Sequence, residues 1–134
     1  MIQTRLRGMG VALITPFKED GSVDYEALLR LVDYQLQNGT DFLCVLGTTA
    51  ETPTLTKEEK EKVKRTVIDR VNGRIPILLG VGSNSTQAVV ESVKNDDMTG
   101  VDAKTIPLDD KKTMSIFTSS KVLGYEDDPI LGPT

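Results

Sequence analysis

Residues 43–55 read Leu43-Cys44-Val45-Leu46-Gly47-Thr48-Thr49-Ala50-Glu51-Thr52-Pro53-Thr54-Leu55. The apolar start of this stretch predicts a short buried strand, and the glycine followed by two hydroxyl residues predicts a polar loop. The next residues are Thr56-Lys57-Glu58-Glu59. They match a capping box, in which the first hydroxyl and the last carboxylate satisfy backbone N–H groups at a helix start. The local order is therefore strand, loop, helix.

Thr48 and Thr49 lie in the loop of this unit. In parallel α/β folds, ligands bind in the loops at the carboxyl ends of the strands. That position makes both threonines candidates for binding or catalysis. When only their spacing is considered, the commoner interpretation is that their hydroxyls hold the backbone of an ordinary turn.

Two similar units flank this one, so strands and amphipathic helices alternate along the first part of the chain. We expect strands at 10–15, 42–46 and 76–81, and helices at 24–38, 57–71 and 86–94. Nearly continuous apolar strands that alternate with such helices predict a parallel sheet covered by helices, an α/β fold. Two architectures fit: a doubly wound sheet, or the first three βα units of a (β/α)₈ TIM barrel, which needs roughly 250 residues when complete.

The pattern changes after Val101-Asp102-Ala103. Residues 104–112 contain Lys104, Pro107 and a run of charges, which a central parallel strand does not accept. We therefore expect an irregular, mostly non-strand tail, with one or two helical turns at 113–118. The predicted division is a partial barrel at 1–97, a junction at 98–103, and a tail of different origin at 104–134.

Composition excludes several classes of function. The 134 residues are 38% hydrophobic and 27% charged, which suits one domain with a core. The net charge of −4 argues against a nucleic-acid surface. The chain has no histidine, so we expect no metal site, and we see no signal peptide or membrane span. The single cysteine, Cys44, lies in an apolar run and is expected in the core, with the cytoplasm as the default compartment.

Three segments resemble the dihydrodipicolinate synthase family over about residues 1–103. They are Gly10–Phe17, Leu46–Leu55 and Gly73–Thr86. The box Gly47-Thr48-Thr49-Ala50-Glu51 is characteristic of the N-acetylneuraminate lyase superfamily, to which that family belongs. The resemblance favours the TIM barrel, and it favours a functional role for the two threonines.

The resemblance implies a lyase of lysine biosynthesis that is usually tetrameric and needs no cofactor. It condenses pyruvate with aspartate semialdehyde through a Schiff base on a lysine. Thr48 corresponds to a proton-relay threonine that works with a tyrosine, and Thr49 to a residue that holds the pyruvate carboxylate. Asn84 matches a position that contacts allosteric lysine in feedback-regulated members, although Lys57 and Ala88 stand where those members have His and Glu.

The relay tyrosine, the substrate-binding arginine and the Schiff-base lysine of the family all lie beyond the point where the resemblance stops. We therefore expect no Schiff-base lysine and no activity in this chain. Four of its lysines lie on a charged helix face: Lys57, Lys60, Lys62 and Lys64. Lys104 is the one lysine near a strand end, but its flanks are polar and do not suit a desolvated nucleophile.

Residues 98–117, continuing into Leu123-Gly124, resemble a segment of the PolC-type alpha subunit of bacterial replicative DNA polymerase. The two resemblances share Thr99–Ala103, so the leading hypothesis is a chimera of a synthase fragment and a non-catalytic polymerase segment. Two alternatives stay open. One is a non-catalytic half-barrel that binds small carboxylates weakly or self-associates, and the other is a fragment of a replicative polymerase.

Overall fold

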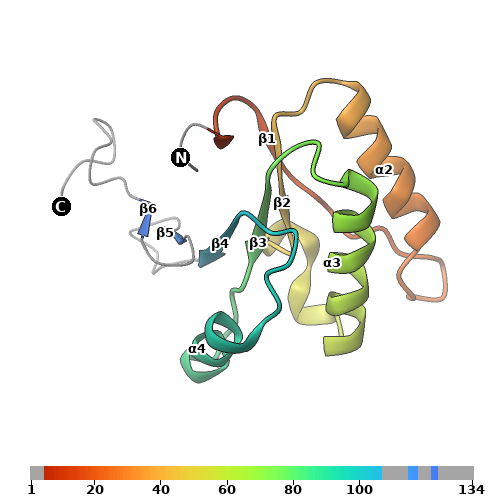
Figure 1. Cartoon of the computed structure of the whole chain (residues 1–134). Coiled ribbons are helices and arrows are strands. Elements are labelled where there is room, and N and C mark those ends of the chain that lie inside the picture. The colour runs from red at the N-terminus through yellow and green to blue at the C-terminus, as the bar shows by residue number, and fades with distance from the viewer. Residues whose placement is uncertain (1–4, 107–114, 118–121, 124–134) are drawn as a thin grey trace.

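The computed structural model describes residues 5–106, 115–117 and 122–123. Its elements alternate between strands and helices up to the fourth strand (Figure 1). They are β1 (Gly10–Ala12), α2 (Tyr25–Gln37), β2 (Phe42–Val45), α3 (Lys57–Val71), β3 (Ile77–Gly80), α4 (Thr86–Asn95) and β4 (Ala103–Ile106), followed by β5 (Ser115–Phe117) and β6 (Val122–Leu123).

The first four strands form a parallel sheet in the order of the sequence, β1-β2-β3-β4. Ala12, Cys44, Leu78 and Ala103 stand side by side in the register of the four strands. β5 and β6 continue the sheet as antiparallel strands. The predicted α/β fold with three opening βα units is confirmed.

The structure differs from the expectation that the regular pattern ends at residue 103, because a fourth strand, β4, continues to residue 106. Residues 103–106 pair with β3 in parallel, with Lys104 beside Leu79. A lysine can occupy this strand because its ammonium donates hydrogen bonds to two backbone carbonyls inside the fold. Pro107 follows the last residue of β4 in the sequence, so the four-residue strand itself contains no proline.

Beyond β4, the tail is described only at the two short strands β5 and β6. Residues 115–117 form β5, so the helical turn expected at 113–118 is wrong for these three residues. The remainder of that expected turn, and the rest of the tail, lie outside the described residues.

The helix starts follow the sequence signals closely. The Thr56 hydroxyl accepts from the Glu59 N–H at 3.1 Å, and the Glu59 carboxylate accepts from the Thr56 N–H at 2.9 Å. This reciprocal pair is the predicted capping box of α3. At α2, the Asp24 carboxylate accepts from the Ala27 N–H at 3.0 Å.

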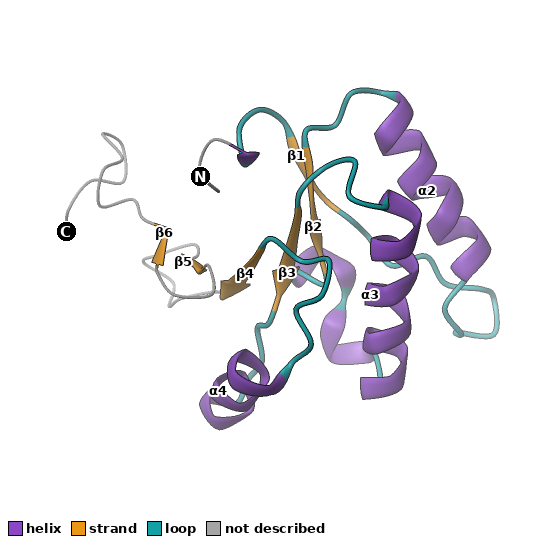
Figure 2. Ribbon diagram, viewed as in Figure 1, coloured by secondary structure: helices purple, strands orange, loops and turns teal. Residues whose placement is uncertain are grey.

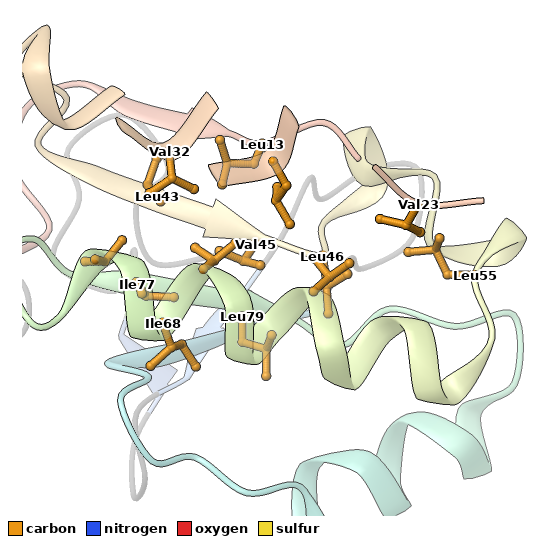
Figure 3. Packing of buried hydrophobic residues seen from close by; sticks show 14 of the residues in the cluster. Leu13, Val23, Val32, Leu43, Val45, Leu46, Leu55, Ile68, Ile77 and Leu79 are labelled. Atoms are coloured by element: carbon orange, nitrogen blue, oxygen red, sulfur yellow. The ribbon is translucent and has the colours of Figure 1, made fainter. Parts of the chain in front are cut away.

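α2 and α3 lie together against one side of the sheet, and α4 lies apart from them (Figure 2). Along β2, Leu43 and Val45 are buried, whereas Phe42 and Cys44 on the other face are only half-buried. The buried apolar side chains gather along β2, β3 and α3 (Figure 3). α4 buries none of its residues, and its Val90 and Val93 are exposed.

Candidate active site at the carboxyl end of β2

The chain leaves β2 through an unusual backbone path. Leu46 has a φ of 57° and Glu51 a φ of 56°, so two non-glycine residues adopt the left-handed conformation within six positions. Between them, Thr48–Ala50 form one turn of 3₁₀ helix. Left-handed non-glycine residues store strain, and such strain concentrates where a binding or catalytic loop needs a fixed shape. The 3₁₀ turn therefore qualifies as a candidate site by its geometry.

Thr48 and Thr49 are both exposed on this turn. Neither hydroxyl makes a hydrogen bond to residues 5–106, the continuous part of the chain that the structure describes. Other groups hold the turn: the Thr15 hydroxyl donates to the Ala50 carbonyl at 2.8 Å, and the Thr54 hydroxyl donates to the Glu51 carbonyl at 2.8 Å. In this part of the chain, no contact therefore supports the interpretation that Thr48 and Thr49 hold the turn.

A close approach between two strand ends also shapes the turn. A Cβ atom on Gly80, the last residue of β3, would lie 2.2 Å from the carbonyl oxygen of Leu46. Any side chain at position 80 would push the Leu46 backbone away, so a glycine is required there. Sequence analysis missed Gly80, Leu46 and Thr15 as supports of the site. Two of them had a signal in the sequence: Gly80 closes an apolar strand, and Thr15 is a hydroxyl residue that precedes Pro16.

A cavity of about 430 Å³ lies between α3 and α4, and its lining includes neither Thr48 nor Thr49. Lys57, Ala88 and Ser83 line it, and Asn84 follows Ser83 in the exposed loop before α4. The structure therefore places Lys57, Ser83 and Ala88 together in a cavity that is separate from the turn after β2. The lining also includes three lysines of α3 and three carboxylates, one from α3, one from α4 and one just after α4: Lys57, Lys60, Lys64, Glu61, Glu91 and Asp96.

Lys104 is buried, with 4% of its surface exposed. Its Nζ donates to the carbonyls of Ser92 at 2.8 Å and Val93 at 3.1 Å, and lies 3.9 Å from Asp96 Oδ2. Desolvation lowers the pKa of Lys104; Asp96 opposes that change and the nearby Lys64 adds to it. The ammonium therefore serves as a cation at the negatively polarised end of α4, and its hydrogen bonds direct it toward that helix.

Cys44 lies on the face of β2 opposite Leu43 and Val45. Burial raises the pKa of its thiol, although a hydrogen bond with Thr105 acts in the opposite direction. A thiol with a raised pKa stays protonated and unreactive. The expectation that Cys44 lies in the core is wrong, because its side chain is only half-buried and lies outside the main apolar cluster.

Within 5–106 and the two short strands, no three His, Cys, Asp or Glu side chains are placed to hold a metal ion. In the same part of the chain, none of the helices has the length and apolarity needed to cross a bilayer.

Comparison with known proteins places these features in one family. The sequence model of the dihydrodipicolinate synthetase family matches residues 5–106. The chain is 87% identical over 103 residues to the 4-hydroxy-tetrahydrodipicolinate synthase of Phocaeicola vulgatus, and 68% identical over 103 residues to that of Parabacteroides distasonis. Each match covers 77% of this chain and 35% of the relative. The chain thus spans about a third of the length of these relatives.

Solved structures show the same relationship. The dihydrodipicolinate synthase of Aquifex aeolicus aligns with a TM-score of 0.68 and 46% identity, over 75% of this chain and 34% of that one. The chloride-inhibited enzyme of Acinetobacter baumannii, complexed with pyruvate, aligns with a TM-score of 0.71 and 39% identity, over 75% of this chain and 35% of that one.

The comparisons do not support the polymerase resemblance of residues 98–117. The family match runs through the predicted junction at 98–103 and includes β4 up to residue 106. The parallel strands, the Gly47–Glu51 turn and the family match agree with one another. The chain belongs to the dihydrodipicolinate synthetase family, and its residues 5–106 correspond to the amino-terminal portion of that family's TIM barrel.

Proposed function

We propose that the whole protein is a pyruvate-dependent lyase of lysine biosynthesis, which condenses pyruvate with aspartate semialdehyde, and that this chain supplies Thr48 and Thr49 to its site. The observation that carries this proposal is the turn after β2. Both threonines are exposed there, and hydrogen bonds from other residues hold the backbone beneath them. The names of the relatives give the product, 4-hydroxy-tetrahydrodipicolinate, and one solved relative is complexed with pyruvate.

The two hydroxyls have different proposed roles. Thr49 binds the pyruvate carboxylate, which a hydroxyl donor can do without placing a full positive charge beside the imine. Thr48 relays a proton, because a hydroxyl has one donor and two lone pairs and stays neutral while it passes a proton on.

Pyruvate binding tests these roles. We expect weak binding, in the millimolar range that corresponds to about 4 kcal/mol, measured by calorimetry and by slowed hydrogen exchange of residues 46–52. Thr49→Val is expected to abolish binding. Thr86→Val, at an exposed threonine in the first turn of α4, is the matched control and leaves binding unchanged. If pyruvate binds equally well to Thr49→Val, the proposed site is wrong.

We also propose that this chain alone forms no imine with pyruvate. Imine formation joins a lysine nitrogen to the carbonyl carbon and releases water, so it needs a neutral, accessible amine. Lys104 is bound to two carbonyls, and Lys57, Lys60 and Lys64 line the separate cavity between α3 and α4. Borohydride reduction in the presence of pyruvate, followed by mass spectrometry, is expected to show no adduct. An adduct on any lysine would overturn this proposal.

Asn84 is proposed as an effector contact for free lysine. It follows Ser83, which lines the α3–α4 cavity together with Lys57 and Ala88. Lys57 is cationic and Ala88 is apolar, so neither position offers a carboxylate to the ammonium of an amino acid, and the carboxylates that do line the cavity share it with three lysines. We therefore expect lysine to bind less tightly to this chain than to its Ala88→Glu variant, as measured by calorimetry.

We also propose that the tail has a different origin; the sequence placed its start at residue 104, whereas the family match extends to residue 106. The matches to the two curated relatives each extend over 103 residues. Sequencing of the source DNA across codons 90–110 is expected to confirm Lys104-Thr105-Ile106-Pro107. A reading frame that continues from Ala103 into an apolar strand and a tyrosine pair would instead show that the chain from 104 onward is an artefact.

A further inference from the structure

Thr15 joins two segments that are far apart in the sequence. It lies just beyond β1 and is 3% exposed. Its hydroxyl donates a hydrogen bond of 2.8 Å to the carbonyl of Ala50, 35 positions later. Pairing of this segment with β2 continues past β1 itself, because the Leu13 N–H donates to the Cys44 carbonyl at 3.0 Å. The backbone just before Thr15 is therefore fixed to β2, and this fixes the position from which the Thr15 hydroxyl binds the turn.

The carbonyl that Thr15 binds belongs to the residue that ends the 3₁₀ turn. Ala50 is 2% exposed, and the next residue, Glu51, has a left-handed backbone. Inside the turn, Ala50 N–H donates to Gly47 and Glu51 N–H donates to Thr48, both at 3.1 Å. A single 3₁₀ turn with two internal hydrogen bonds is weak by itself. The buried Thr15 hydroxyl anchors its end, while the Leu46–Gly80 approach sets its beginning.

We propose that Thr15 is a positioning residue for the site: its hydroxyl fixes the 3₁₀ turn, so that the Thr49 hydroxyl is placed to bind a small carboxylate and the Thr48 hydroxyl to relay a proton. This inference rests on the proposed function for its ligand, but the anchoring itself is a property of the free chain. Removal of the hydroxyl leaves the buried Ala50 carbonyl without its partner, and a buried unpaired carbonyl is unfavourable enough to move the turn.

Three variants of the full chain test the role of Thr15. Thr15→Val keeps the shape and removes the donor, and Thr15→Ser restores the donor. Thr40→Val is the matched control, because Thr40 is also buried, at 4% exposed, and its hydroxyl donates to Gln35 Oε1 at 2.7 Å. Thr40 precedes β2, so it lies at the other end of the strand from the turn.

The first measurement is the affinity for pyruvate. We expect Thr15→Val to weaken it by about fivefold to tenfold, as the loss of one buried hydrogen bond implies. Thr15→Ser and Thr40→Val are expected to stay within about twofold of wild type. If Thr15→Ser binds as weakly as Thr15→Val, or Thr40→Val weakens binding to the same extent, the effect is one of general stability and the proposal is wrong.

The second measurement needs no ligand and separates this proposal from the proposed function. Hydrogen exchange of the Ala50 and Glu51 amides is expected to accelerate in Thr15→Val, but not in Thr15→Ser or Thr40→Val. If wild type does not bind pyruvate, the proposed function fails and the exchange result alone decides the role of Thr15. Unchanged exchange at both amides in Thr15→Val would overturn the positioning role.

Discussion

Lys104 shows how a charged residue can enter a parallel strand. The side chain stands beside Leu79 in the sheet register, where an apolar residue is usual. Two carbonyls of α4 accept hydrogen bonds from its ammonium, and Asp96 Oδ2 lies 3.9 Å from its nitrogen. These partners compensate for part of the cost of desolvation, but the pKa of Lys104 is still lowered from its ordinary value of 10.5.

The lowered pKa of Lys104 gives a prediction about pH. Between its folded-state pKa and 10.5, the unfolded chain binds more protons than the folded chain, so the free energy of unfolding rises with pH. Below that window the full cost of the buried charge is present. We expect Lys104→Met to be more stable than wild type at neutral pH, by about 1 kcal/mol, and the difference to narrow as the pH approaches 10.5.

Urea unfolding at several pH values checks this prediction. Lys94→Met is the control, because Lys94 is an exposed lysine in the last turn of α4. A wild-type chain that loses stability relative to Lys104→Met as the pH rises would contradict the assignment of desolvation as the dominant cause.

Helices α3 and α4 have the same kind of start but different packing. Both begin with a hydroxyl N-cap, Thr56 for α3 and Ser85 for α4. α3 buries Val63, Val67 and Val71 against the sheet, whereas α4 buries none of its residues. Most helix stability in proteins comes from such packing. The unfolding of α3 is therefore coupled to that of the core, and the unfolding of α4 is largely local.

Replacement of the N-cap residue by alanine is therefore expected to change the global free energy of unfolding more at α3 than at α4. Thr56→Ala is expected to lower the global free energy of unfolding by about 1 kcal/mol, the usual cost of a lost N-cap. Ser85→Ala is expected to change global stability by less than about half of that, and to accelerate hydrogen exchange within α4. Urea unfolding and exchange mass spectrometry give the two quantities. Equal losses of global stability would show that α4 unfolds together with the core.

At the scale of the whole molecule, β1 stands at one edge of the sheet. Met9 and Ile14, which flank this strand, are 54% and 53% exposed. An edge strand with exposed apolar neighbours is a template for pairing with another chain. In the described part of the chain, an edge strand and exposed apolar side chains beside it therefore both favour self-association.

We expect the chain to associate at micromolar concentration, as measured by size exclusion with light scattering. Ile14→Lys is expected to reduce that association, because a charge beside an edge strand opposes pairing. Tyr34→Lys is the control, since Tyr34 is a comparably exposed side chain on α2, at 60%. A sharp monomer peak for wild type, together with cooperative melting, would contradict the prediction.

Local sequence patterns determined the order of strands and helices, the parallel sheet and the capping box of α3, because each depends on periodicity or spacing within a few residues. They also placed Thr48 and Thr49 after a strand. Only the tertiary structure decided that β4 includes Lys104, that Thr15 binds Ala50 and that Gly80 admits the Leu46 backbone. These contacts join residues from 11 to 35 positions apart, and whether a buried group finds its partner depends on how the elements pack, which no local pattern records.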